Sequence, residues 1–120
     1  MAQTLIRKEQ IEDYAVDYSL VSEASSATPT ATGTALRNDY VATALAENAI
    51  LAAPSGTANA GAVIRYRITA SGGTRTIGYN AALLAGNVTR TTSLPAGETL
   101  TQIYHRVGST WVCVFNEVTS

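Results

Sequence analysis

The chain has 120 residues, a formal net charge of −1 and 46% hydrophobic residues, which is the length of one domain with one core. This near-neutral charge excludes the strongly basic proteins that bind nucleic acid, and no stretch approaches the roughly 20 apolar residues that span a bilayer. Cys113 is the sole cysteine, so neither an intrachain disulfide nor a thiolate metal cluster can form. We therefore expect one soluble domain without a classical signal peptide, metal or cofactor.

The apolar content is rich in alanine, and Phe and Trp occur once each. Large side chains supply most of the stabilisation of a core, so a single chain would have a thin one. Burial between subunits can stabilise such a chain. The composition thus favours an oligomer.

Residues 5–21 carry two overlapping patterns. Tyr14 and Tyr18 follow Ile11 at helical spacing, while Tyr14, Val16, Tyr18 and Leu20 also alternate as a strand would. We favour a short helix or irregular start followed by an extended strand. In both cases one face is apolar, and its residues are the candidates for attachment to a partner: Ile6, Ile11, Tyr14, Val16, Tyr18 and Leu20.

Residues 22–36 consist mainly of Ser, Ala and Thr with one Pro and one Gly. Such a composition buries little apolar surface and is typical of a linker or extended arm. We therefore divide the chain into an N-terminal arm and linker, 1–36, and a body, 37–120.

Residues 38–52 give conflicting signals. Ala, Leu and Glu favour helix, whereas the surrounding sequence is rich in strand and turn signals. We predict two strands, Tyr40–Leu45 and Ala49–Ala52, around the turn 46–48.

The region after Pro54 has the clearest strand pattern. Ile64, Tyr66 and Ile68 alternate with Arg65, Arg67 and Thr69, which predicts a half-buried strand. The glycines of 71–73 predict a turn into a strand at 74–79, and the turn 94–97 precedes a hairpin of 99–107 with 110–115, which would place Tyr104 near Trp111. Six to eight short strands of this kind predict an all-β fold, a small antiparallel sandwich or barrel with an N-terminal arm.

Candidate catalytic residues are scarce. His105 is the sole histidine and lies in mid-strand, and Cys113 lies between two valines, which predicts a small buried apolar residue and not a nucleophile. Gly72 and Gly73 lack the Lys-Ser/Thr of a phosphate-binding loop. An enzyme is thus the least favoured class. A catalytic activity that is lost in His105→Ala would be needed to support it.

Charge is unevenly distributed along the chain. Residues 1–24 hold Glu9, Glu12, Asp13, Asp17 and Glu23 against Arg7 and Lys8, whereas residues 60–115 hold five arginines against Glu98. Pairing of the acidic arm with the basic body, within or between subunits, is one consequence. A basic docking face would consist of Arg65, Arg67 and Arg75, although alternating arginines are also common on the solvent face of a sheet.

The stretch LAAPSGTANAGAVIRYRITASGGTRTIGYNAALLAGN followed by LPAGETLTQIYHRVGSTWVCVF resembles a β domain of tailed-bacteriophage virion proteins. The likeness covers about residues 50–115. Tyr79 stands where that pattern often has Trp. The matching positions are Pro54, Gly56, Ile64, Arg65, Ile68, Gly73, Arg75, Ile77, Tyr79, Asn80, Leu94, Pro95, Tyr104, Trp111 and Val112.

The resemblance implies a homotrimer that serves in a fibre or as capsid decoration. Its expected partners are further copies of itself and the major capsid protein, and its expected location is the virion surface after synthesis in the host cytoplasm. The arm would grip the shell, and trimer packing or the core would bury Ile64, Tyr66, Ile68, Tyr104 and Trp111.

A second hypothesis is a short tail fibre or receptor-binding module. Its binding surface would contact a host glycan, without nucleic acid or membrane as a partner. The residues proposed for that surface are Tyr79, Asn80, Arg90 and His105.

Overall fold

The structure is a computed structural model that describes residues 17–120. These residues form nine strands and no helix, which confirms the all-β prediction. The strands are β1 (Tyr18–Glu23), β2 (Arg37–Leu45), β3 (Ala49–Leu51), β4 (Val63–Ala70), β5 (Arg75–Tyr79), β6 (Leu83–Leu84), β7 (Ser93–Leu94), β8 (Thr99–Val107) and β9 (Thr110–Thr119).

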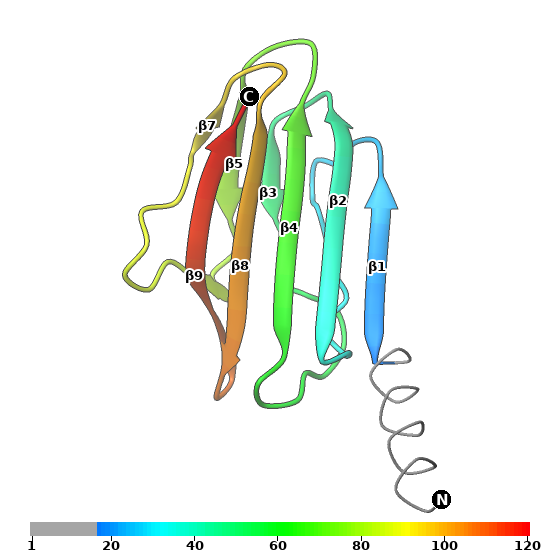
Figure 1. The fold of residues 1–120 in the computed structure, drawn as a ribbon, viewed down its shortest axis with the longest axis vertical. Helices are drawn as coiled ribbons and strands as arrows, with labels where there is room; N and C mark the ends of the chain where they lie inside the picture. The colour runs from blue at the N-terminus through cyan, green and yellow to red at the C-terminus, as the bar shows by residue number, and fades with distance from the viewer. Residues whose placement is uncertain (1–16) are drawn as a thin grey trace, which may run out of the picture.

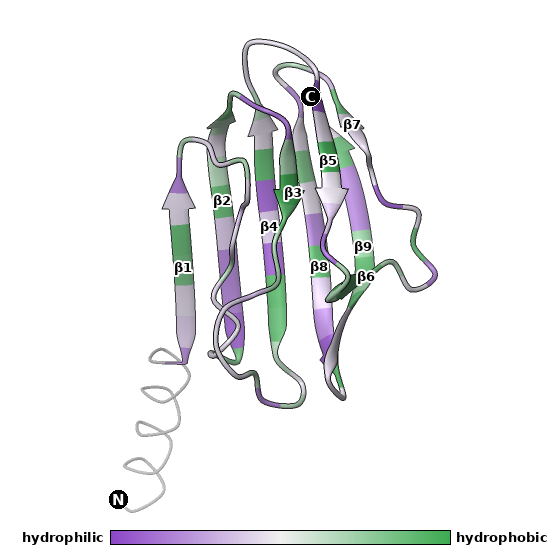
Figure 2. Cartoon of the chain, turned by 180° about the vertical axis from the view of Figure 1, so that it is seen from behind, coloured by the Kyte–Doolittle hydropathy of each residue, from purple (hydrophilic) through white to green (hydrophobic). Residues whose placement is uncertain are grey.

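The strands are arranged in two layers. A six-stranded sheet has the order β1-β2-β4-β8-β9-β6, and a three-stranded sheet has the order β3-β5-β7. The large sheet lies in front in Figure 1, and Figure 2 shows the small sheet from the other side. The fold is thus a sandwich, and the core lies between the layers.

The large sheet is mixed, which corrects the antiparallel prediction. β1 pairs with β2 and β2 with β4 in parallel, whereas β4, β8 and β9 are antiparallel. The reason is that β3 lies in the other layer between β2 and β4. The chain therefore returns through the small sheet before it re-enters the large one in the same direction.

The predicted linker is part of the body. Residues 27–33 run beside β3, where Ile50 N donates to Ala27 O and Ser55 N to Ala31 O, both at 2.9 Å. Ala31 is fully buried. Backbone hydrogen bonds fix this segment, and its small side chains let it lie flat on the core. Its low apolar content therefore led to the wrong prediction of a linker. The boundary at residue 36 is therefore not a structural one.

The conflict at residues 38–52 is resolved in favour of strands. β2 buries Tyr40, Ala42 and Leu45, and β3 buries Ala49 and Leu51. Tertiary burial at period two outweighs local helix propensity here. The prediction of two strands is confirmed, with β2 starting three residues earlier than expected.

Inner-face residues of the large sheet form the core. Alternation along β4 is as predicted, with Ile64, Tyr66 and Ile68 buried and Arg65 and Arg67 exposed. The bands of hydropathy along the strands are visible in Figure 2. The five residues assigned to core or trimer packing are 0–2% exposed within one chain, so they are core and are not free to form a subunit interface: Ile64, Tyr66, Ile68, Tyr104 and Trp111.

The C-terminal hairpin is confirmed, with a different register. A bulge between Ile103 and Tyr104 places Tyr104 opposite Cys113, and Arg106 opposite Trp111. The turn at 71–73, in contrast, does not close a hairpin. It carries the chain from β4 in the large sheet to β5 in the small one.

Candidate interaction surface

The side of the six-stranded sheet that faces away from β3, β5 and β7 is here called the outer face. No other described strand covers it (Figure 1). Several large apolar side chains on it are exposed, among them Leu20 (56%), Tyr18 (47%) and Phe115 (39%). The strand register places Ile103 beside Phe115 on the same face. These side chains form two groups, Tyr18 with Leu20 on the edge strand β1 and Ile103 with Phe115 on β8 and β9, and β2 and β4 lie between the groups. Exposed apolar side chains on an open sheet face are suited to contact with a partner.

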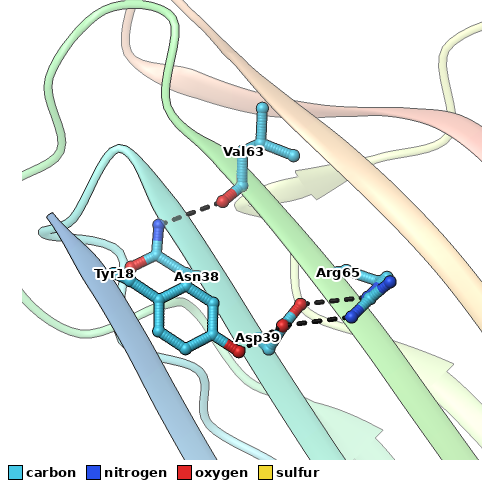
Figure 3. A network of polar contacts seen from close by, with 5 residues as sticks. All are labelled: Tyr18, Asn38, Asp39, Val63 and Arg65. Carbon is cyan, nitrogen blue, oxygen red and sulfur yellow. Dashed lines mark hydrogen bonds and ion pairs between the residues drawn. The ribbon is translucent and has the colours of Figure 1, made fainter. Parts of the chain in front are cut away.

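A charged cluster lies on this face near the start of β1, β2 and β4 (Figure 3). Arg65 donates from Nε to Asp39 Oδ1 at 3.0 Å and from Nη2 to Oδ2 at 3.1 Å. Tyr18 Oη donates to Asp39 Oδ2 at 2.6 Å. This hydrogen bond is the main cause of the raised pKa of Tyr18. Asp39 thus joins three strands, and it neutralises one arginine of the face.

Asn38, on the buried side of β2, holds the edge strand in register. Its Oδ1 accepts from Ser19 Oγ at 2.6 Å, and its Nδ2 donates to Ala35 O at 2.8 Å and Val63 O at 3.0 Å. A buried amide with all these partners fixes β1 and β4 against β2. The position of Tyr18 on the outer face depends on this register.

A shallow pocket of about 130 Å³ opens beside the cluster. Its apolar part is formed by Val63 and Ile103. Its charged part includes Arg37, which makes no hydrogen bond or ion pair with another side chain of residues 17–120. The complete lining is Tyr18, Arg37, Asn38, Asp39, Val63, Arg65 and Ile103. This combination suits a ligand that offers a carboxylate next to an apolar side chain.

Arg67 extends the positive charge along β4. It is exposed, and it also lacks an acidic partner within residues 17–120. Glu117 lies on the same face two strands away, because Arg67 is opposite Thr101 and Thr101 is opposite Glu117. The charge of the outer face is therefore positive over β2 and β4 and negative on β9.

The predicted basic face is only partly assembled. Arg65 and Arg67 share the outer face, but Arg75 belongs to the small sheet, where its Nε donates to Ser71 O at 3.1 Å and Leu45 O at 3.3 Å. Arg75 is thus corrected to a residue that holds the turn 71–73. Alternation from Arg37 onward would have identified Arg37 and Asp39, had the strand been extended back to that residue.

The predicted attachment residues divide into two groups. Tyr18 and Leu20 lie in β1 on the outer face. The remaining four, Ile6, Ile11, Tyr14 and Val16, lie outside the described residues. The sequence pattern assigns Tyr18 and Leu20 to an arm, whereas the structure places them on the edge strand of the large sheet, with β2 between them and Arg65.

The residues proposed to bind a glycan do not form one surface. Tyr79 and Arg90 lie together, with the Arg90 guanidinium carbon 3.9 Å from the Tyr79 ring centroid. Arg90 Nη1 donates to Leu83 O at 2.7 Å. Asn80 is exposed at the end of β5, whereas His105 projects from the outer face of the other sheet. Arg90 and Tyr79 hold the loop after β6 on the core.

Gln102 is the centre of a polar cluster that also contains Tyr79, Tyr104 and Asn116. Its Nε2 donates to Tyr79 Oη and to Asn116 Oδ1, both at 2.8 Å, and its Oε1 accepts from Tyr104 Oη at 3.0 Å. Burial raises the pKa of Tyr79 and of Tyr104. The polar groups of this cluster find their hydrogen-bond partners within the chain, which is typical of a structural role.

Cys113 is buried, as predicted, and burial raises the pKa of its thiol. Within residues 17–120 no group of three His, Cys, Asp or Glu side chains is placed to hold a metal ion. A search of the same residues for a helix long and apolar enough to cross a membrane finds none.

Comparison with known proteins finds no significant match to a protein-family model, a curated protein or a solved structure.

Proposed function

We propose that this protein is a non-enzymatic structural component of a tailed-bacteriophage virion, a capsid decoration or cement protein. It attaches to the major capsid protein and stabilises the shell. The resemblance of residues 50–115 to a virion β domain suggests the class of particle. The attachment surface comprises Tyr18, Leu20 and the apolar residues that precede them.

One observation carries this proposal. The outer face is an open sheet surface on which Leu20 and Tyr18 are about half exposed and lie next to the Asp39–Arg65 pair. An apolar patch rimmed by charge is typical of a protein–protein contact. Weak single contacts of this kind suffice on a repeating lattice, because a symmetric oligomer engages several sites at once.

The test is co-sedimentation of the protein with capsids from particles that lack it. We expect Leu20→Ser to weaken capsid binding at least about tenfold, since a central apolar contact is worth more than 1 kcal/mol. The matched control is Ile50→Ser, because Ile50 is 57% exposed, as Leu20 is 56%, but lies on the small sheet. Equal loss in the two variants, or loss in neither, would reject the outer face as the attachment surface.

Deletion of residues 1–16 tests the rest of the attachment surface. This deletion leaves β1 intact, and β1 pairs with β2 from Tyr18 to Glu23. We expect a folded body that no longer binds the capsid. Full binding by residues 17–120 would contradict the role of the preceding residues.

The location on the particle separates this proposal from the receptor-binding hypothesis. Gold-labelled antibody against residues 54–120 avoids the N-terminal epitopes. Label over the head would agree with decoration, whereas label confined to the tail tip would replace it with a fibre or receptor-binding role.

A further inference from the structure

We propose that strand β1 pairs edge to edge with β1 of a second copy, in antiparallel orientation, so that two large sheets join across a two-fold axis. The contact uses backbone groups at the edge of the sheet and leaves the side chains of the outer face accessible. Both partners are copies of this chain. The inference therefore does not rest on a virion role.

The outward backbone groups of β1 have no partner in the described chain. β1 pairs with β2, and Figure 1 shows no described strand on its other side. Arg37 N of β2 donates to Asp17 O, so the backbone groups of Asp17 face β2. The backbone groups of successive residues face opposite sides of a strand. The N–H and C=O groups of Tyr18, Leu20 and Ser22 therefore face away from the sheet, and none of them bonds to another backbone group of residues 17–120.

The other edges of the two sheets are covered or very short. At the far end of the large sheet β6 pairs with β9, and the loop after β6 lies against β9, where Thr91 N donates to Asn116 Oδ1 at 3.1 Å. In the small sheet the segment 27–33 covers β3, and β7 has two residues followed by Pro95. Covering loops, short strands and prolines are devices that prevent pairing between sheet edges.

β1 has none of these devices. Its six residues pair with β2 without a register shift, and the sequence YSLVSE contains no Pro, Gly, Lys or Arg. Leu20 is 56% exposed at this edge. A regular edge strand with exposed apolar residues is a template for another strand. The contrast with the other edges indicates that β1 is the edge at which the protein adds a strand.

The charge pattern of β1 favours a second copy as the source of that strand. In a two-fold contact each residue at the axis meets the same residue, so a charge there would meet an equal charge. Residues 18–22 are uncharged. Asp17 and Glu23 flank them. The carboxylate of Asp17 accepts from Leu36 N at 2.9 Å, and that of Glu23 accepts from Tyr40 Oη at 2.6 Å. The axis of a two-fold contact can thus lie within an uncharged stretch.

The flanking carboxylates exclude two of the registers that symmetry allows. A pairing centred on Leu20 would place Asp17 opposite Glu23 of the second copy, and like charges directly opposite destabilise a sheet. A pairing centred on Ser19 would place the carboxylate of Asp17 opposite the apolar Val21. Both registers are therefore unfavourable.

A pairing centred on Val21 has neither defect. It places Leu20 opposite Ser22 of the second copy on each side of the axis, and these outward groups exchange about four backbone hydrogen bonds. Val21 packs against the core of its own chain, and in this register it also meets its own copy. Tyr18 and Leu20 keep their side chains on the outer face, so the two copies present one continuous outer face.

The contact is closed by its two-fold axis and builds a dimer, whereas the resemblance implies a trimer. Two six-residue strands form a contact smaller than a standard protein–protein interface. We therefore expect a dissociation constant in the micromolar range, with the dimer populated at high concentration.

Proline at Ser22 tests the pairing on the full chain, with the mass measured by sedimentation and light scattering over a range of concentrations. Ser22→Pro removes an N–H that faces away from β2, so β1 stays paired with β2 while the dimer loses about two hydrogen bonds. We expect the dissociation constant to rise at least about tenfold. Ser22→Ala is the matched control, because it removes the same hydroxyl and keeps the N–H. It should dimerise as the unchanged chain does.

Cysteine cross-linking tests the register and does not depend on the proline variant. In the proposed dimer Val21→Cys places two thiols opposite each other in a pair without mutual hydrogen bonds, which is close enough for a disulfide. We expect a covalent dimer after oxidation with diamide. Ile50→Cys is the control, because this exposed position lies on the small sheet, and it should give no covalent dimer.

Three results would each overturn the proposal. They are an unchanged chain that stays monomeric up to about 1 mM, a dimer of Ser22→Pro as tight as that of Ser22→Ala, and as much covalent dimer from Ile50→Cys as from Val21→Cys. These assays contain no capsid. Unchanged capsid binding by a Leu20→Ser chain that still dimerises would therefore refute the proposed attachment surface alone.

Discussion

Two tyrosines on the inner face of the large sheet allow a controlled test of how the core is stabilised. Tyr66 and Tyr104 are both fully buried, and their rings meet edge to face at 5.6 Å between centroids. Their hydroxyl groups differ. Tyr104 Oη donates to Gln102 Oε1 at 3.0 Å and accepts from Arg90 Nη1 at 3.2 Å, whereas Tyr66 Oη has no partner among residues 17–120. The same Tyr→Phe change should therefore have opposite effects at the two positions.

The magnitudes follow from the partners that remain. Tyr104→Phe leaves Gln102 Oε1 buried without a donor, which costs about 1–3 kcal/mol. Tyr66→Phe removes a buried hydroxyl that makes no hydrogen bond among residues 17–120. We therefore expect it to raise the free energy of unfolding by between about 0 and 1 kcal/mol. We expect the two variants to differ by about 2 kcal/mol, a roughly 30-fold difference in the ratio of folded to unfolded protein.

Equilibrium unfolding in urea, followed by fluorescence of Trp111, measures both free energies. The m value should be unchanged, since neither variant alters the area exposed on unfolding. Equal destabilisation by the two changes would refute the reasoning, because it would mean that the Tyr66 hydroxyl contributes as much as that of Tyr104.

Gly33→Ala should destabilise the fold by about 1–3 kcal/mol in thermal or urea unfolding, because an added Cβ would lie 3.0 Å from Trp111 Cζ2; a neutral variant would show that the ring can shift freely. Cys113 should react slowly with a thiol reagent in the native protein and readily after unfolding, because burial raises its pKa and thus lowers the thiolate fraction at neutral pH; an equal rate in both states would contradict its burial. Tyr18 should ionise at a higher pH in the native protein than in Asp39→Asn, as measured by ultraviolet titration, because its hydrogen bond to Asp39 favours the protonated phenol. Since the folded pKa is raised, this bond stabilises the fold below the ordinary pKa of tyrosine, and the contribution is lost as the pH rises through the folded value; identical titration curves would show that the hydrogen bond does not persist in solution.

Residues 22–36 show where composition gave a wrong prediction. Few large apolar residues and many Ser, Thr and Ala predicted a linker, but small side chains also allow a chain to lie flat against a packed surface. Backbone hydrogen bonds to β3 then supply what side-chain burial does not. Gly33 illustrates this, because a Cβ added there would lie only 3.0 Å from Trp111 Cζ2.

The candidate surface was found in fragments by sequence alone. Arg65 and Arg67 were identified from alternation in one strand, and Tyr18 and Leu20 from alternation in another. Their approach depends on β2, which lies between them and pairs with both strands in parallel. Alternation at period two shows which residues of one strand share a face. It contains no information about which strand lies beside it.

The sequence by itself determined the all-β class, most strand positions after residue 37, and the buried side of β4, because burial of every second side chain leaves its trace in local order. The tertiary structure alone decided the parallel arrangement of β1, β2 and β4, the joining of Arg65 with Asp39 and Tyr18, and the separation of Arg75 from the other arginines. These depend on which layer each connection crosses and on register between distant strands. Alternation is the same for a strand that runs in either direction, so only the packing of the two layers selects one arrangement.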